Sequence, residues 1–183
     1  MAAIWIILAL IVIIALYAIS VHNRLVRLRN QGEEAFAAID AHLKQRYDLV
    51  PNLVETVKGY AAHERETLTA VIDARNRAMS ATTIEEKDAA DKSFSATLKS
   101  LFALAESYPD LKANQGFIDL QNQLSKIEVE LLNARKYYNA VIKQFNTVVE
   151  VFPSSIFARL GHFEKQPYLA IEEAARARVE VKF

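Results

Sequence analysis

An uncharged apolar run at the N-terminus constrains this chain more than any other feature. No charged side chain occurs between Ala2 and Val21. About 20 residues at about 1.5 Å each span roughly 30 Å as a helix, which matches the hydrocarbon core of a bilayer. Trp5 and Tyr17 lie toward the two ends of the run, where their rings suit the headgroup boundary. We therefore predict a transmembrane anchor over residues 1–22.

A cleaved signal peptide is the alternative interpretation, because residues 18–20 resemble a small-x-small cleavage site. No basic side chain precedes the apolar run, and the run is longer than the 7 to 15 residues usual for a signal peptide, so a retained anchor is favoured. Arg24, Arg27 and Arg29 follow the run directly. The positive-inside rule then predicts a single-pass protein with a cytoplasmic C-terminal body.

The rest of the composition is typical of a helical protein with balanced charge. Lys and Arg total 22 and Asp and Glu total 22, which argues against a nucleic-acid partner held by bulk charge. Only 4 Gly and 4 Pro are present, too few for the many turns of an all-β fold. The chain has no Cys, so disulfides and thiol nucleophiles are excluded.

Apolar residues recur at three- and four-residue steps along three long segments. The first is predicted to continue from the anchor to about residue 80, with a kink but no full break at Pro51. The second covers about 84–107 and begins at the Thr82-Thr83 pair, whose hydroxyls suit a helix start. The third covers about 114–150. A shorter helix over 155–160 is predicted to end with Gly161 as a left-handed cap.

Three long amphipathic helices with short connections bury their apolar stripes by packing antiparallel. We predict an all-α fold, in which an N-terminal transmembrane helix continues into an elongated antiparallel bundle of three to four helices with coiled-coil character. The predicted domains are the anchor over 1–22, the bundle over 23–160 and a C-terminal part over 161–183. That last part is expected to hold a small helix over 170–178 and an extended tail over 179–183.

The sequence lacks the motifs of common catalytic sites. None of the four His residues follows a Glu by three positions, which removes the Glu-x-x-His pairs of di-iron bundles. His63-Glu64 begins like a zincin motif, but Thr67 stands where the second His ligand belongs. A Gly-rich phosphate loop and a Gly-x-Ser-x-Gly turn are both absent from the sequence. We predict no catalytic, cofactor-binding or metal-binding residue.

A dense polar ladder brackets the proline, and Asp40, Lys44, Asp48 and Asn52 follow one another at four-residue spacing. Such a ladder forms one face of a helix. The face is either solvated surface or a surface that binds a partner. These four residues are the candidate partner-binding site in the bundle.

Other polar residues have structural interpretations. Arg46 can point inward and pair with Glu128 or Asn139 in a layer that fixes the helix register. Lys112, Arg135, Tyr138 and Asn139 are expected to satisfy groups inside the bundle, with a functional role as the alternative. At the C-terminus, Val181 and Phe183 either pack on the bundle or a neighbouring subunit, or form a tail that a partner captures by strand addition.

Several stretches of the sequence resemble the LemA family. The most specific is Asp48-Leu49-Val50-Pro51-Asn52-Leu53-Val54, and the resemblance extends over nearly the whole chain after the apolar run. The other stretches that carry it are Leu25 to Asn30, Ala38 to Asp40, Leu43 to Tyr47, Val57 to Tyr60, His63-Glu64, Ala74-Arg75, Pro109 to Ala113, Leu120-Gln121, Ala134-Arg135, Tyr138-Asn139, Phe145-Asn146 and Phe152-Pro153. Gly32 and Phe36 depart from the aliphatic residue and the Trp usual in the family.

The resemblance implies a single-pass protein of the bacterial inner membrane with a helical cytoplasmic body and no established catalytic activity. Some relatives are associated with magnetosome membranes and others with a membrane-bound heat-shock metalloprotease. We therefore expect a non-enzymatic scaffold that homo-oligomerises to organise or shape the bilayer. The alternative is an adaptor that presents its bundle or its tail to a membrane protease or a stress-response partner. No cofactor is expected in either case.

Overall fold

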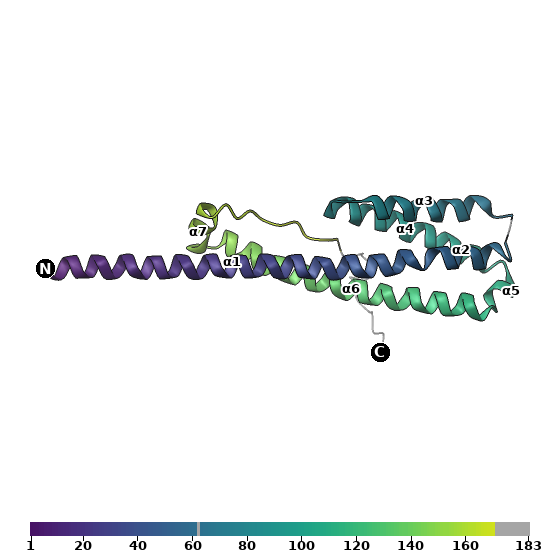
Figure 1. The fold of residues 1–183 in the computed structure, drawn as a ribbon, viewed down its shortest axis with the longest axis horizontal. Helices are drawn as coiled ribbons and strands as arrows, with labels where there is room; N and C mark the ends of the chain where they lie inside the picture. The colour runs from purple at the N-terminus through teal and green to yellow at the C-terminus, as the bar shows by residue number, and fades with distance from the viewer. Residues whose placement is uncertain (62, 171–183) are drawn as a thin grey trace, which may run out of the picture. The chain divides into compact units, whose positions relative to one another are not determined.

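The computed structural model describes residues 1–61 and 63–170, and this part of the chain consists of helices and connecting turns without a strand (Figure 1). The predicted all-α class is confirmed. The helices are α1 (Ala2–Asp48), α2 (Val50–Lys58), α3 (Arg65–Ser80), α4 (Ile84–Ala105), α5 (Pro109–Lys112), α6 (Gln115–Glu150) and α7 (Ser154–Leu160). The predicted small helix over 170–178 and the tail over 179–183 lie outside the described residues, apart from Ala170.

The apolar run forms the beginning of α1, and its large side chains from Ile4 to Ile19 are exposed, whereas Val21 at its end is buried. Trp5 is 70 % exposed and Ile13 is 63 % exposed. Within the described residues, one helical stretch is long and apolar enough to cross a membrane, and its apolar window is not buried in the protein. This stretch is a candidate membrane span by length and composition.

The chain forms two compact units, and α1 and α6 contribute to both. Unit 1 comprises residues 1–37 and 135–168, and unit 2 comprises residues 38–134 together with residues 169 and 170 of the described chain. The predicted domain boundaries after residues 22 and 160 remain a prediction.

α1 and α6 pack antiparallel in unit 1. The ring centroids of Phe36 and Tyr138 lie 5.9 Å apart, whereas the earlier α1 residue Leu25 packs in one cluster with the later α6 residue Phe145. A Cβ on Gly32 would lie 3.1 Å from Cδ1 of Ile142, so the glycine permits a close approach of the two helices.

The same antiparallel order holds in unit 2, where His42 Nδ1 lies 3.5 Å from Glu130 Oε2 and Arg46 pairs with Glu128. α3 and α4 add a second antiparallel pair, joined by a short turn. At that turn Thr83 caps α4. Its hydroxyl accepts a hydrogen bond from the Glu86 N–H at 3.1 Å, and the Glu86 carboxylate accepts from the Thr83 N–H. The predicted cap is confirmed and forms a complete capping box.

The predicted single helix from residue 2 to residue 80 is wrong. α1 and α2 are separated only by Leu49, and Leu49 itself has helical backbone dihedral angles. The prediction that the helix does not break fully at Pro51 is therefore confirmed. The chain turns between Lys58 and Arg65, and α3 then packs on α2 and α4. Gly59, a poor helix former, begins this turn.

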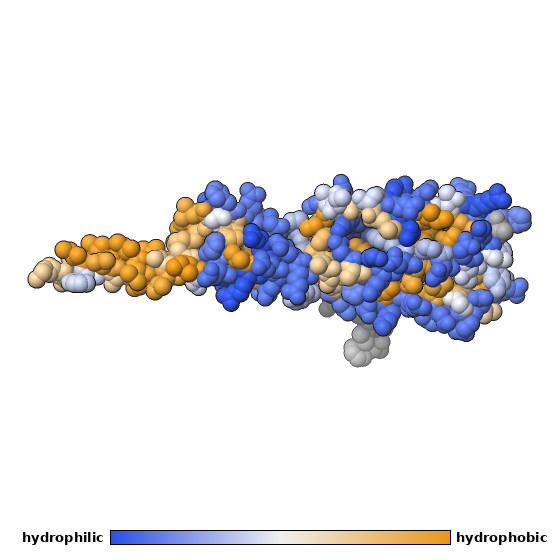
Figure 2. Space-filling view, in the orientation of Figure 1, coloured by the Kyte–Doolittle hydropathy of each residue, from blue (hydrophilic) through white to orange (hydrophobic). Residues whose placement is uncertain are grey.

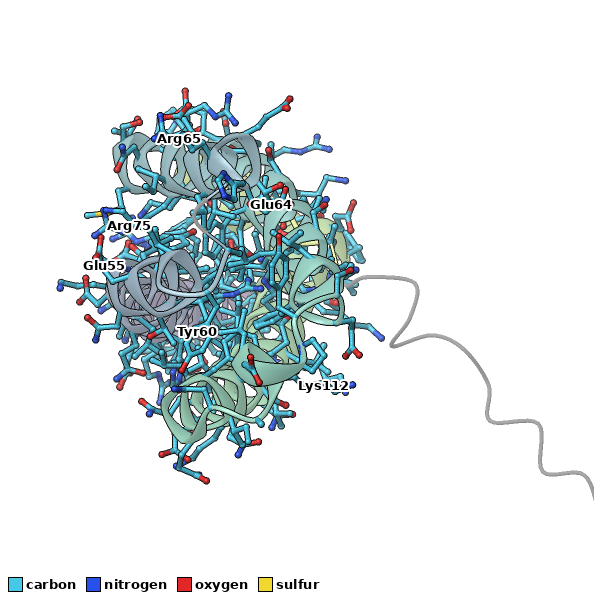
Figure 3. All side chains as sticks on the ribbon, turned by 90° about the vertical axis from the view of Figure 1, so that its right-hand side faces the viewer. Glu55, Tyr60, Glu64, Arg65, Arg75 and Lys112 are labelled. Atoms are coloured by element: carbon cyan, nitrogen blue, oxygen red, sulfur yellow. The ribbon has the colours of Figure 1, made fainter. Side chains whose placement is uncertain are left out.

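Long-range hydrogen bonds hold the turn in place. The Asn114 side-chain amide donates to the Tyr60 hydroxyl at 3.0 Å, and the Tyr108 hydroxyl donates to Glu64 Oε1 at 3.1 Å. The Glu64 carboxylate raises the pKa of Tyr108 through this hydrogen bond. Tyr60 and Glu64 lie on the side of unit 2 that faces the viewer in Figure 3.

The predicted helix over 155–160 is confirmed as α7, but the left-handed cap at Gly161 is wrong. Gly161 has φ −86°, and His162 instead adopts φ 55°. The Phe163 N–H donates to the Ala158 carbonyl at 2.9 Å and the His162 N–H donates to the Arg159 carbonyl at 3.1 Å, which is the Schellman pattern with His162 at the left-handed position. A Cβ at position 161 would lie 2.8 Å from the Phe163 ring, so packing requires the glycine.

Candidate functional site

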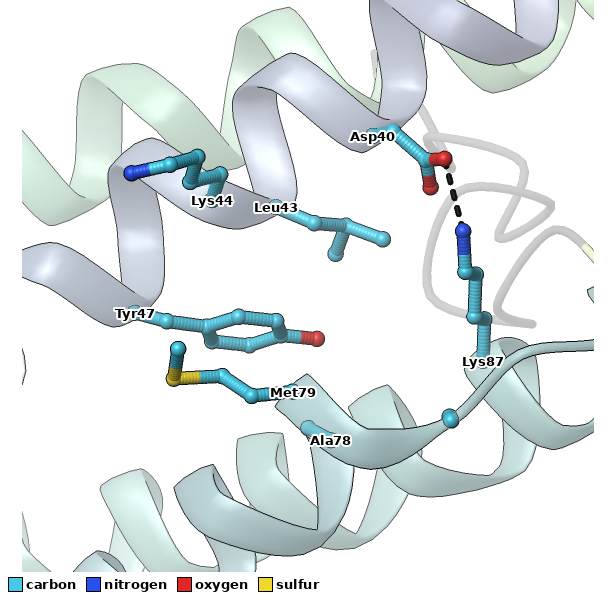
Figure 4. A pocket seen from close by; sticks show the side chains of 8 residues that line it. Asp40, Leu43, Lys44, Tyr47, Ala78, Met79 and Lys87 are labelled. Atoms are coloured by element: carbon cyan, nitrogen blue, oxygen red, sulfur yellow. Dashed lines mark hydrogen bonds and ion pairs between the residues drawn. The ribbon is translucent and has the colours of Figure 1, made fainter.

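A groove in unit 2 holds two of the residues predicted to bind a partner. Asp40, Leu43, Lys44 and Tyr47 share one face of α1 because they follow the helical repeat. The end of α3 and the start of α4 form the opposite wall, with Ala78, Met79, Ala81 and Lys87. The cavity measures about 250 Å³ and Figure 4 shows it from close by.

The floor of the groove is apolar. Leu43, Tyr47 and Ala78 are buried, whereas Met79 is 53 % exposed at its margin. The Tyr47 ring is held edge-on against Phe94, with 5.2 Å between the ring centroids. Methionine adapts its shape to different apolar partners. The groove can therefore accept an apolar side chain from a bound segment.

Charged pairs border this apolar floor. Lys87 Nζ lies 2.6 Å from Asp40 Oδ2, which joins the start of α4 to α1. Lys44 Nζ lies 2.7 Å from Asp48 Oδ2 on the exposed surface of α1. Asn52 is exposed on α2, and its carbonyl accepts a hydrogen bond from the Thr56 hydroxyl. Of the four ladder residues, the structure brings Asp40 and Lys44 into the groove, whereas Asp48 and Asn52 are not among its lining residues.

A buried ionic layer lies beside the groove. Arg46 Nη1 lies 2.9 Å from Asp91 Oδ1 on α4, and Arg46 Nη2 lies 2.9 Å from Glu128 Oε2 on α6. The guanidinium also stands over the Phe94 ring, 5.3 Å from its centroid. The sequence leaves Glu128 or Asn139 as the partner of an inward Arg46, and the structure pairs Arg46 with Glu128. The layer joins α1, α4 and α6 of unit 2.

Sequence reasoning missed Asp91, which is only 2 % exposed. Its position gave a usable signal, because residues 91, 94, 98, 101 and 105 form the buried stripe of α4. An acidic residue on an apolar stripe needs a buried cationic partner. Arg46 occupies the corresponding position on the stripe of α1.

Polar residues in unit 1 bind backbone groups after α7. The Tyr138 hydroxyl donates to the Pro167 carbonyl at 3.2 Å, so Tyr138 satisfies a carbonyl after α7, outside the predicted bundle over 23–160. Asn146, which is buried, donates from its amide to the Gln166 carbonyl and accepts from the Gln166 N–H, both at 2.9 Å. Lys165 pairs with Glu150 at 2.6 Å, and the carboxylate raises the pKa of the lysine.

Two of the candidate residues, Val181 and Phe183, lie outside the described residues. Within the part of the chain that the structure describes, His, Asp and Glu side chains form no group of three or more that could hold a metal ion.

Comparison with known proteins identifies the family. The model of the LemA family matches residues 35–183, which is most of the chain. This chain belongs to the LemA family. The matched LemA region begins within α1 after the apolar segment and includes the groove and the ionic layer. The predicted family resemblance is confirmed.

The chain is also similar to protein LemA of Metamycoplasma hominis (strain ATCC 23114). The two are 27 % identical over 142 residues, which cover 75 % of this chain and 63 % of that relative. This LemA family chain thus spans less than two thirds of the relative's length.

Proposed function

We propose that the protein is a non-enzymatic scaffold of the bacterial inner membrane, anchored by α1, whose copies associate to organise or shape the bilayer. The observation that carries the proposal is the composition of α1. One helix, Ala2–Asp48, begins with an apolar segment whose large side chains from Ile4 to Ile19 are exposed and ends with residues buried in a helical core. Such side chains are stable in lipid and costly to expose to water.

The polar groups of unit 2 support a structural role. Arg46 on α1 pairs with Asp91 on α4 and with Glu128 on α6, and Asp40 on α1 pairs with Lys87 on α4. These contacts fix the relative positions of helices in this unit. A scaffold requires such a fixed surface in order to meet identical copies in one geometry.

Self-association is tested by light scattering on the full chain in detergent. We expect a protein mass of at least twice the 20.6 kDa of one chain, and this mass should stay constant as detergent is added. The exposed apolar helix carries the small residues Ala2, Ala3, Ala9, Ala15 and Ala18, which allow close helix packing in lipid. A strictly monomeric mass at all protein concentrations rules out the scaffold.

The cytoplasmic location of the body is part of the same proposal, because Arg24, Arg27 and Arg29 follow the apolar segment. The chain has no Cys, so a Lys99→Cys variant carries a unique label site on the exposed face of α4. An impermeant maleimide should label this variant in lysed cells and leave it unlabelled in intact spheroplasts. Labelling of intact spheroplasts would place the body outside.

The groove of unit 2 favours a second candidate, an adaptor that binds a membrane protease or a stress-response protein. An apolar floor bordered by charged pairs is suited to a peptide segment with one apolar side chain between polar ones. A Met79→Glu variant should abolish co-purification of the partner, because it replaces the adaptable apolar side chain at the margin of the groove with a charge.

The matched control for the adaptor is Ser80→Glu, since Ser80 is exposed beside Met79 but does not line the groove. Circular dichroism should show equal helix content in both variants. Equal recovery of the partner with both variants would refute docking in the groove.

A further inference from the structure

Large apolar side chains are exposed on α7 and in the turn before it. Ile156 and Leu160 are four residues apart on α7, so they lie on one side of this helix, and they are 48 % and 73 % exposed. Phe152, in the turn before α7, is 76 % exposed, and Val151 beside it is also exposed. Together these four side chains form an exposed apolar stripe, which marks a surface that meets an apolar environment.

Contacts with α1 fix the position of α7 along the axis of α1. The Phe157 ring meets the Tyr17 ring edge-on, with 5.6 Å between centroids. Ala158 packs in the core of unit 1 with Val21 and Leu25. Tyr17 and Leu25 are about 12 Å apart along α1, and they flank the point where the uncharged run ends at Val21. α7 therefore lies beside the last turns of the apolar segment.

Basic side chains lie next to the apolar stripe. Arg24, the first charged residue after the apolar segment, lines a cleft of about 270 Å³ together with Tyr17, Ser20 and Phe152. Arg159 follows on α7 itself. Figure 2 shows the apolar surface of the N-terminal helix continuing onto the region of α7. Apolar side chains with adjacent arginines suit the boundary between acyl chains and anionic headgroups.

We propose that α7 is an interfacial membrane element, with Phe152, Ile156 and Leu160 inserted at the headgroup boundary of the leaflet where α1 leaves the bilayer. The proposal rests on α1 being the membrane anchor. Continuity with the apolar segment identifies lipid as the occupant of this face, because the contact between Phe157 and Tyr17 holds the stripe at that depth. The protein thus contacts the membrane through a span and a second, shorter element far along the sequence.

Fluorescence quenching by brominated lipid tests the two membrane contacts separately. The full chain is reconstituted in vesicles of phosphatidylcholine and phosphatidylglycerol, with the bromines near the carbonyl end of the acyl chain. Trp5 is the only Trp in the sequence, so the unmodified chain reports on the anchor. A Trp5→Phe, Phe152→Trp variant reports on α7, and a Trp5→Phe, Tyr137→Trp variant is the matched control, since Tyr137 is a similarly exposed aromatic residue on α6.

We expect the lipid to quench the Phe152→Trp variant at least as strongly as the unmodified chain, and to leave the Tyr137→Trp variant unquenched. Quenching of Trp5 without quenching of the Phe152→Trp variant overturns the interfacial element and leaves the anchor standing. Absence of quenching at Trp5, measured with deeper bromines as well, overturns the anchor and the interfacial element together. Equal quenching of the Tyr137→Trp variant shows that lipid contact is not specific to α7, and also overturns the inference.

Discussion

Units 1 and 2 both use α1 and α6, but their interiors have different chemistry. Unit 1 contains an apolar cluster in which Leu25, Phe145 and Ala158 pack together, although it also buries Arg135 and Asn146. Unit 2 buries Arg46 and Asp91 as an ion pair among its apolar residues. An apolar cluster tolerates substitutions that conserve volume, whereas a buried ion pair is costly unless both members are present. In unit 2 a charged pair, Arg46 with Glu128, joins α1 to α6, whereas apolar packing joins the two helices in the cluster of unit 1.

The largest expected effect comes from breaking the ionic layer. An Arg46→Met variant removes the guanidinium that pairs with the buried Asp91, which should lower the free energy of unfolding of unit 2 by about 3–5 kcal/mol. Hydrogen exchange of the α4 amides in the detergent-solubilised chain measures this loss. The control is Lys44→Met, which removes an exposed pair worth about 0–1 kcal/mol. Equal effects of the two variants would show that the buried layer does not stabilise unit 2.

An intermediate effect is expected in unit 1 from Asn146→Ala. This change removes both hydrogen bonds to Gln166 and leaves backbone groups unsatisfied, at a cost of about 1–3 kcal/mol. We expect faster proteolysis of residues 161–168 with unchanged exchange in α4 of unit 2. The comparison variant is Thr147→Ala, which loses only an exposed hydrogen bond to Lys143 on the same helix. Loss of protection in α4 would show that the two units do not unfold independently.

The smallest effect concerns pH at the start of α4 in unit 2. Backbone N–H groups of Thr82 and Thr83 donate to the Glu86 carboxylate and lower its pKa from 4.5. A lowered folded-state pKa gives stability that is present above 4.5 and lost as the pH falls through the lower folded value. Exchange of the first-turn amides of α4 should rise over that range in the unmodified chain. A Glu86→Gln variant should lose this dependence, and its persistence would contradict the assignment to Glu86.

Most of the helices were predictable because their apolar stripes are long and their ends carry clear signals. Thr83 with Glu86 marks the start of α4, and Pro153 with Gly161 brackets α7. An inward Arg46 was one of the alternatives that the sequence left open, with Glu128 or Asn139 as its partner. The helix ends and the apolar stripes depend on local sequence, or on one face of one helix, and so could be predicted without the tertiary structure.

The turn at residues 59–64 could not be predicted in this way. The apolar stripe keeps its phase from Val57 to Leu68, so local periodicity favours one continuous helix. The turn instead depends on Asn114 and Tyr108, which are distant in sequence and bind Tyr60 and Glu64. The same turn explains why only part of the groove was predicted. Asp40 and Lys44 lie together on α1 and were predicted from their spacing, whereas Met79 lies beside them only because the turn folds α3 back.

The hairpin of α3 and α4 has a consequence for the order in which the chain acquires its structure. Its two helices are neighbours in sequence and pack on each other, and contacts between near neighbours form quickly because little chain entropy is lost in closing the loop. The hairpin is thus expected to form early and to present Asp91 on a packed surface. α1 and α6 then meet this surface through Arg46, which pairs with Asp91 and with Glu128.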